Sequence, residues 1–156
     1  MRVRPTFALC AATFLAGGIL SAGAAEIAPD EVVFKDDIEV MDSLTGQPGD
    51  PANGREVFAD RKLGNCLACH ANSDMSELPF HGDVGPVIDG VASRYEPSQL
   101  RAIVVNSKNV FGPETIMPSF YRLENGARPM EEFQGKTILS AQQVEDVVAY
   151  LTTLSD

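Results

Sequence analysis

The most regular alternation of apolar and polar residues lies near the C-terminal end of the chain. There, apolar side chains recur three and four positions apart, at Val144, Val147, Val148, Leu151 and Leu154. This spacing places them along one stripe of an α-helix. Ser140 and Gln143 have the spacing of a capping box, in which each side chain accepts a hydrogen bond from the backbone N–H of the other residue. The sequence therefore predicts an amphipathic helix that begins just after Ser140.

A second helix is predicted well before this one. An Asp-Pro pair supplies an N-cap and a first helical residue for a helix over residues 51–61. On that helix Gly54 and Phe58 share a face, and the glycine permits close approach of another backbone. We therefore expect this face to cross the C-terminal helix near Tyr150 and Leu151.

The middle of the chain is predicted to be mostly loop. One helix with an apolar face is expected over residues 97–106. Prolines and glycines interrupt residues 71–93 and 107–136, which favours irregular loops in both segments. Three helices separated by long loops indicate an all-α domain, predicted over residues 48–156.

Residues 1–25 have the composition of a secretory signal peptide. Arg2 and Arg4 form a short basic start, residues 7–20 are mainly apolar, and small residues follow, as at a cleavage site. A membrane anchor is the alternative, but this apolar run is short of the roughly 20 residues that span a bilayer. We expect cleavage near Ala25 or Glu26 and export of the remaining chain.

Residues 26–47 form a leader before the predicted domain. Apolar and polar residues alternate weakly there, which favours extended segments that lie across a surface of this chain or of a partner. The whole chain has 12 basic and 22 acidic residues, a formal net charge of −10. This charge makes nucleic acid a poor ligand and favours partners with basic surfaces. For most of the carboxylates, exposure to solvent is the simpler interpretation.

The chemistry of the chain centres on a Cys-x-x-Cys-His motif made of Cys66, Cys69 and His70. This pattern is the attachment signature of a c-type haem. Two cysteines on one short turn can form thioethers with the vinyl groups of a porphyrin, and the adjacent histidine then lies beneath the iron. We therefore expect one covalently bound haem c with His70 as an iron ligand. Because c-type haem is attached outside the bacterial cytoplasmic membrane, the motif and the signal peptide together predict a periplasmic protein.

Two other kinds of protein site, a redox dithiol and a zinc site, also use a Cys-x-x-Cys pair. A thioredoxin-like dithiol would follow an apolar strand in a βαβ unit, and no such strand precedes Cys66. A zinc site needs four ligands, and the spacing of Cys66, Cys69, His70 and His81 does not match that of zinc fingers. The haem interpretation is favoured over both.

A six-coordinate iron needs a ligand on its second face. The candidates after the signal peptide are Met41, Met75, Met117, Met130 and His81. Met117 is favoured because it precedes a proline in a loop, follows a helix that can form the distal wall, and is far from Cys69 in sequence. Met75 is too close to Cys69 to reach the other side of the ring easily. A lone methionine is more often part of a core, and a loop histidine such as His81 is more often exposed.

The proximal side of the haem is predicted from residues 85–90. The second ring nitrogen of His70 needs an acceptor that fixes its tautomer, and a backbone carbonyl near Gly85 and Pro86 is a candidate. Residues 85–90 resemble the Gly-Pro-x-Leu-x-Gly loop of class I cytochromes c, in which the proline carbonyl accepts this hydrogen bond. The resemblance implies the class I cytochrome c fold and assigns the acceptor to Pro86.

Longer stretches resemble a narrower family, SoxX. They are residues 83–86, 90–95, 103–111, 117–122 and 139–154. The resemblance implies the monohaem cytochrome subunit of the periplasmic SoxAX complex, whose SoxA subunit carries the active-site haem. That complex joins thiosulfate to a cysteine of the carrier protein SoxYZ, as an L-cysteine S-thiosulfotransferase. The SoxX subunit is then a non-catalytic relay that passes the released electrons to a soluble cytochrome c.

Three functions remain open from the sequence: an electron-transfer subunit of an enzyme complex, a freely diffusing class I cytochrome c, and a dithiol oxidoreductase. The leader over residues 26–47 and an insertion over residues 122–136 exceed what a diffusing cytochrome needs, which favours the first. No catalytic residue is predicted in this chain. The roles of His81 and of the leader are not implied by the resemblance.

Overall fold

The computed structural model describes residues 25–156, so the signal peptide predicted over residues 1–25 lies outside the described residues apart from Ala25. Three α-helices lie within these described residues: α1 (Pro51–Ala59), α2 (Pro97–Phe111) and α3 (Ala141–Leu151). Four single-turn 3₁₀ helices lie between them: η1 (Cys66–Ala68), η2 (Ser73–Met75), η3 (Val91–Ser93) and η4 (Glu131–Phe133). The remaining described residues form loops with one isolated bridge between Lys35 and Glu39, which confirms the all-α prediction. None of the helices in residues 25–156 is both long and apolar enough to cross a membrane.

The two helix starts predicted from capping residues are present. The Asp50 carboxylate accepts a hydrogen bond from the Ala52 N–H at 2.9 Å, with proline as the first residue of α1. At α3, Ser140 Oγ accepts from the Gln143 N–H at 3.2 Å, and Gln143 Oε1 accepts from the Ser140 N–H at 2.9 Å. These bonds satisfy backbone donors that have no partner inside the helix.

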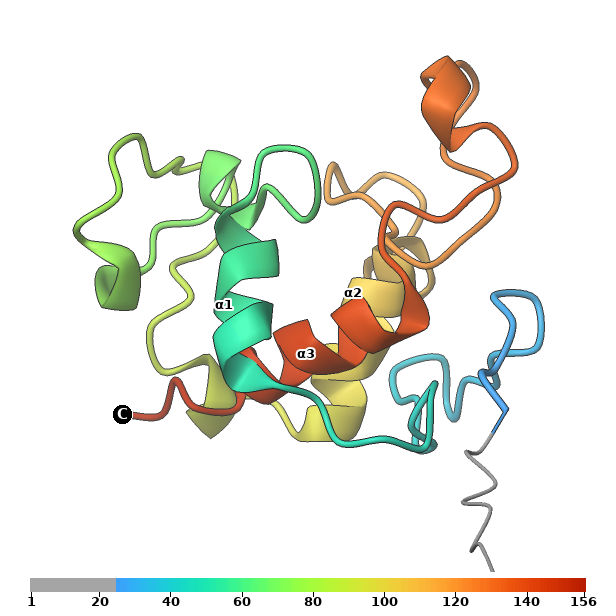
Figure 1. Cartoon of the computed structure of the whole chain (residues 1–156), viewed down its shortest axis with the longest axis horizontal. Helices are drawn as coiled ribbons and strands as arrows, with labels where there is room; N and C mark the ends of the chain where they lie inside the picture. The colour runs from blue at the N-terminus through green and yellow to red at the C-terminus, as the bar shows by residue number, and fades with distance from the viewer. Residues whose placement is uncertain (1–24) are drawn as a thin grey trace, which may run out of the picture.

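Helices α1 and α3 cross at the predicted face, and Figure 1 shows them in contact at the centre of the molecule. Gly54 lies so close to α3 that an added Cβ would overlap the Asp146 carbonyl. One turn later, the rings of Phe58 and Tyr150 pack edge to face with centroids 5.7 Å apart. The predicted apolar stripe of α3 is buried from Val144 to Leu151, whereas Leu154, its last predicted member, lies beyond the end of the helix and is half-buried.

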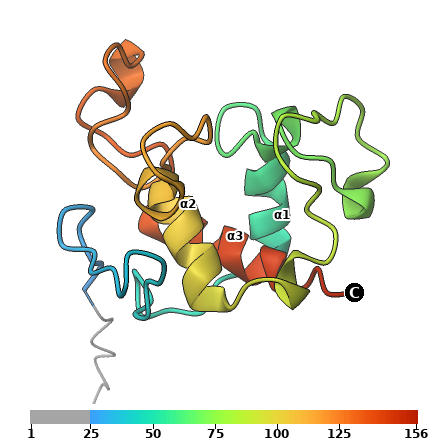
Figure 2. The same ribbon diagram turned by 180° about the vertical axis from the view of Figure 1, so that it is seen from behind.

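Helix α2 is longer than predicted because it continues past a break. Asn106, the last residue of the predicted helix, has non-helical torsion angles (φ −149°, ψ 81°), and helical backbone resumes after it as far as Phe111. Figure 2 shows α2 running beside α3, with the segment that follows α2 folded back over its end. The apolar face of α2 is buried at Leu100, Val104 and Val105.

The leader lies across its own chain. Val40 and Leu44 are buried in the core. The Leu44 N–H donates to Glu145 Oε1 at 2.9 Å, and Arg101 donates both to the Val40 carbonyl at 2.9 Å and to Glu145 at 2.8 Å. A buried ion pair between α2 and α3 therefore also holds the leader. Of the two surfaces that the sequence left open for the leader, this chain or a partner, the structure shows contacts with this chain.

The loops extend from opposite sides of the helices. In Figure 1 the loop over residues 70–90 lies to the left of α1, whereas residues 122–137, including η4, project from the upper right. The loop after α1 and the loop after α2 lie next to each other at the same end of the molecule in both views. The Cys-x-x-Cys-His motif and Met117, which these loops carry, are thereby brought to one end of the fold.

Candidate haem-binding site

The Cys-x-x-Cys-His motif forms a tight turn directly after α1. The backbone N–H groups of Cys69 and His70 both donate to the Cys66 carbonyl, at 3.1 and 2.9 Å. Gly64 precedes the turn, and an added Cβ there would press against the Val57 carbonyl and approach Cys66 Sγ to 3.1 Å. The chain therefore enters the turn close to the end of α1, and glycine is required at this point.

The two cysteines are free thiols in the described chain, with no disulfide between them. Both are half-buried. Burial raises the pKa of the Cys66 thiol to about 12. A dithiol oxidoreductase needs a cysteine whose pKa is lowered, because the thiolate is the nucleophile. The environment of Cys66 therefore opposes the dithiol interpretation. Because neither cysteine is in a disulfide within the described chain, both sulfur atoms are available for thioether bonds.

His70 is held in one orientation. Its Nδ1 donates to the Pro86 carbonyl at 2.7 Å. The Gly85 N–H donates to the Cys69 carbonyl at 2.8 Å, and an added Cβ at Gly85 would overlap the His70 ring. The ring thus lies flat against a glycine, with the proton on Nδ1, and its Nε2 has no hydrogen-bond partner within residues 25–156. An oriented imidazole with a free, deprotonated nitrogen is what a metal-ligating histidine requires.

The four candidate methionines differ in how deeply they are buried. Met75 is fully buried in the core, whereas Met41 and Met130 are 59% and 66% exposed. Met117 is half-buried and packs against the edge of the core. The loop after α2, which carries Met117, lies at the same end of the molecule as the loop after α1 (Figure 2). Its position is therefore compatible with a ligand on the second face of a haem.

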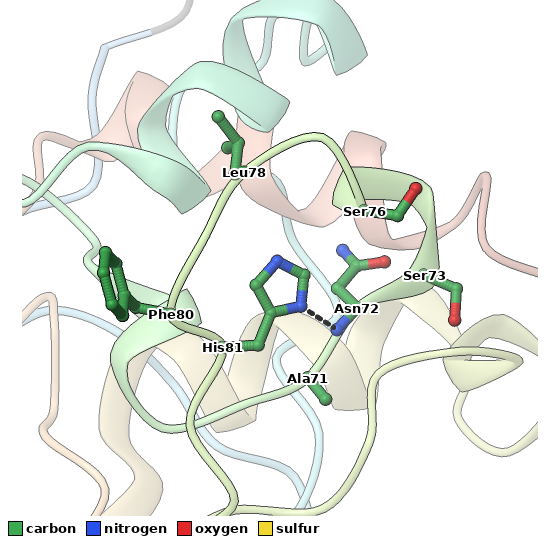
Figure 3. Close-up of a pocket in the computed structure, with 7 residues that line it drawn as sticks. All are labelled: Ala71, Asn72, Ser73, Ser76, Leu78, Phe80 and His81. Carbon is green, nitrogen blue, oxygen red and sulfur yellow. Dashed lines mark hydrogen bonds between the residues drawn. The ribbon is translucent and has the colours of Figure 1, made fainter.

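His81 has both ring nitrogens occupied by backbone groups. Its Nδ1 accepts from the Asn72 N–H at 3.3 Å, and its Nε2 donates to the Met75 carbonyl at 3.1 Å. Figure 3 shows the ring inside the loop formed by residues 71–81, where it also forms one wall of a shallow pocket of about 260 Å³. The pocket is lined by Ala71, Asn72, Ser73, Ser76, Leu78, Phe80 and His81. His81 therefore closes this loop, and neither ring nitrogen is free to bind iron.

These donors fit a covalently bound haem c. Within residues 25–156 the chain offers two free sulfur atoms on one turn, a histidine with one free nitrogen, and a glycine whose lack of a side chain leaves room for the histidine ring. The structure therefore brings together the predicted residues Cys66, Cys69, His70 and Pro86, and it places the loop of Met117 at the same end.

Two residues that the sequence did not single out contact the Met117 loop. Ser107 donates to the Met117 carbonyl at 2.7 Å, and Asn106 accepts from Ser119 at 2.8 Å. Both lie in residues 103–111, one of the stretches that resemble the SoxX family. The Asn-Ser pair at the end of an apolar helical stretch does not distinguish these residues from ordinary capping residues.

Comparison with protein families matches residues 51–155 to the family described as cytochrome c. Comparison with curated protein sequences gave no match. Among solved structures, the chain is similar to one in the crystal structure of SoxXA from P. pantotrophus, with 42% sequence identity and a TM-score of 0.78, over 85% of this chain and 100% of that chain. It is also similar to the c-type cytochrome SorU from Sinorhizobium meliloti, with 26% identity and a TM-score of 0.43, over 67% of this chain and 90% of that chain.

Proposed function

Because this chain belongs to the cytochrome c family, and within it to the SoxX cytochromes, we propose that it is the electron-transfer subunit of a SoxAX-type complex. The protein carries one covalently bound haem c. Its partner is a SoxA-like haem subunit, and the pair works in the oxidation of thiosulfate in the periplasm. The similarity to a SoxXA chain over the whole length of that chain supports this assignment.

We assign the roles in the site as follows. Cys66 and Cys69 form the thioether bonds, His70 is the proximal iron ligand, and Met117 is the distal ligand. When bound, haem c supplies a one-electron centre that alternates between ferric and ferrous iron. The Pro86 carbonyl keeps the proton on His70 Nδ1, so Nε2 offers its lone pair in a fixed direction.

The hydrogen bond between His70 and Pro86 is the observation that carries this proposal. It joins two segments 16 residues apart at 2.7 Å, and it leaves Nε2 free. His81, by contrast, uses both of its ring nitrogens within the fold. The same arrangement favours electron transfer over substrate binding, because His70 and Met117 together leave the iron no open position.

The electrons come from the reaction of the complex. Joining thiosulfate to a cysteine thiol of the carrier SoxYZ forms a sulfur–sulfur bond, releases the thiol proton, and releases two electrons. We propose that this chain would accept these electrons one at a time from the SoxA-like subunit and pass them to a soluble cytochrome c, with haem c supplying the one-electron centre. The acidic surface of this chain, with a formal net charge of −10, favours a basic region on that acceptor.

Co-expression with the SoxA-like protein of the same organism tests the proposal. We expect the two haem proteins to purify together from periplasm, and we expect thiosulfate and SoxYZ to reduce the haem of this chain. Reduction should require the SoxA-like subunit. A monomer that accepts electrons equally well without that subunit would instead be a freely diffusing cytochrome c.

A further inference from the structure

At the break in α2, backbone groups of the helix form hydrogen bonds with another segment of the chain. At Asn106 the backbone leaves the helical region (φ −149°, ψ 81°). The Val104 and Val105 carbonyls accept hydrogen bonds from the Phe120 and Tyr121 N–H groups, at 3.0 and 3.1 Å. The interruption of α2 therefore coincides with a pair of backbone bonds to the segment just after Met117.

Side chains at the break hold the same segment. Ser107 is fully buried, and its hydroxyl lies 2.7 Å from the Met117 carbonyl and 3.0 Å from the Pro118 carbonyl. Asn106 Oδ1 accepts from the Ser119 hydroxyl at 2.8 Å. Together with the two backbone bonds, residues 104–107 contact every residue from Met117 to Tyr121.

A short loop with this many partners is unusual. Loops normally lie on the surface with mobile backbones, because a buried loop must satisfy its polar groups. Here the polar groups of the loop are satisfied by the buried Ser107 hydroxyl and by backbone carbonyls at the break in α2. The Met117 thioether itself has no hydrogen-bond partner within residues 25–156, so its position depends on packing against the core and on how its backbone is held.

We propose that Asn106 and Ser107 are positioning residues that hold Met117 on the haem iron. This inference rests on the proposed role of Met117 as the distal ligand. We define residues 104–107 as the clamp. The clamp fixes the Met117 backbone, so that the thioether returns to the iron quickly whenever the bond opens. It therefore limits access of small competing ligands, which include the sulfur anions expected around a thiosulfate-oxidising complex.

The rate of imidazole binding to the oxidised holo-protein tests the clamp. Imidazole binds ferric iron only after the methionine leaves, so its binding rate reports how often the distal position opens. Ser107→Ala removes the hydroxyl and leaves the Met117 and Pro118 carbonyls without that donor. We expect binding to be about tenfold faster, the ratio that corresponds to a buried hydrogen bond of roughly 1 to 1.5 kcal/mol.

The matched control is Ser98→Ala. Ser98 lies near the start of α2, and its hydroxyl contacts Glu39 at 3.4 Å, far along the helix from the clamp. Its imidazole rate should equal that of the wild-type protein. Ser119→Ala tests the clamp from the loop side, and it should also speed imidazole binding. It serves as the second variant if Ser107→Ala does not fold.

The outcomes separate this inference from the proposed ligation. If Met117→Ala keeps the near-infrared band of a methionine-ligated ferric haem, Met117 is not the ligand and the proposed site is wrong. If Met117→Ala loses the band but Ser107→Ala and Ser119→Ala bind imidazole at the wild-type rate, the ligand assignment holds and the clamp is refuted. A loss of thermal stability without a change in binding rate would assign Ser107 a purely structural role.

Discussion

At the scale of single residues, the two proposed iron ligands are held in different ways. The His70 ring is fixed directly, through its own Nδ1 and the Pro86 carbonyl. Within residues 25–156 the Met117 side chain has packing contacts but no hydrogen bond, and Ser107 donates to its backbone carbonyl. A ligand whose side chain is itself hydrogen-bonded keeps its orientation when the bond to iron opens, whereas a thioether on three rotatable bonds does not. We therefore expect the distal bond to be the labile one.

Replacing Met117 by alanine tests the distal ligand. Thioether ligation favours ferrous iron, so Met117→Ala should lower the reduction potential by on the order of 100 mV, within the roughly 0.8 V that axial ligands span. It should also abolish the near-infrared sulfur-to-iron band of the oxidised protein. Met75→Ala and Met130→Ala are the controls, and both should keep the band. Loss of the band in either control, with its retention in Met117→Ala, would contradict the assignment.

The hydrogen bonds of the Asp74 carboxylate lead to a prediction of how the stability of the protein depends on pH. A hydrogen bond from the Tyr150 hydroxyl at 2.8 Å, and then one from Arg55 at 3.0 Å, lowers the pKa of the Asp74 carboxyl. The folded state therefore binds the proton less tightly than the unfolded state, whose aspartate pKa is about 3.9. The contribution of Asp74 to stability is complete above that pH and is lost as the pH falls through the lower, folded-state value.

The measurement is urea unfolding of the holo-protein between neutral pH and about pH 3, a range set by the aspartate pKa. Asp74→Asn should lower the free energy of unfolding at neutral pH and reduce its fall in acid. The effect should be below about 1 kcal/mol, because the Asp74 side chain is 45% exposed. Asp83→Asn, at an exposed carboxylate, is the control and should leave the pH profile unchanged. Identical profiles for wild type and Asp74→Asn would contradict the prediction.

At the scale of helices, local patterns predict the elements and one of the contacts between them. The starts of α1 and α3 follow from capping residues beside them, and the crossing follows from a glycine and an aromatic residue on one face. The full length of α2 does not follow, because its break is stabilised by residues 117–121. The position of the leader depends on the ion pair of Arg101 and Glu145, which are distant in sequence.

The residues of the site also differ in how far the sequence predicts them. Cys66, Cys69 and His70 can be recognised because the chemistry needs them adjacent, and Pro86 because a loop pattern resembles a known one. The clamp at residues 104–107 cannot be recognised, since a serine and an asparagine at a helix end also occur as ordinary capping or surface residues. Only the contacts with the Met117 loop distinguish them.

Gly54→Ala tests the helix crossing. Alanine favours a helix over glycine by about 1 kcal/mol, so an exposed site would be stabilised. At Gly54 the added Cβ would overlap the Asp146 carbonyl, and α1 and α3 must separate to relieve this contact. Overpacking costs about 1 to 3 kcal/mol and here acts against backbone, so we expect a net loss of about 2 kcal/mol in the free energy of unfolding.

The comparison for this variant is Glu56→Ala, at an exposed position on the same helix. It should change the free energy of unfolding by less than about 0.5 kcal/mol. Urea unfolding followed by circular dichroism measures both variants. A Gly54→Ala protein as stable as the wild type would mean that the two helices do not pack as closely as the structure shows.

At the scale of the whole molecule, the chain without its haem is rich in loop and exposes large apolar side chains. Residues 60–96 contain only single-turn helices within the described chain. Val84 and Val87, beside the Pro86 loop, are 59% and 52% exposed, and Phe111 is 50% exposed. Apolar surface left in water contributes nothing to stability, whereas burial of the same surface contributes about 25 cal/mol per Å². A porphyrin placed between the loop after α1 and the loop after α2 would supply an apolar partner.

We therefore predict that cooperative folding depends on the haem. Replacing Cys66 and Cys69 together by alanine should prevent covalent attachment and give a protein that retains some helix but unfolds without a sharp thermal transition. Met117→Ala is the matched control, because it removes one iron ligand and leaves both thioether bonds, so its transition should remain sharp. Circular dichroism and calorimetry of the three proteins make the comparison. A sharp transition of the double variant near that of the wild type would show that α1, α2, α3 and the leader pack stably by themselves, and that the haem adds redox chemistry to a fold already complete.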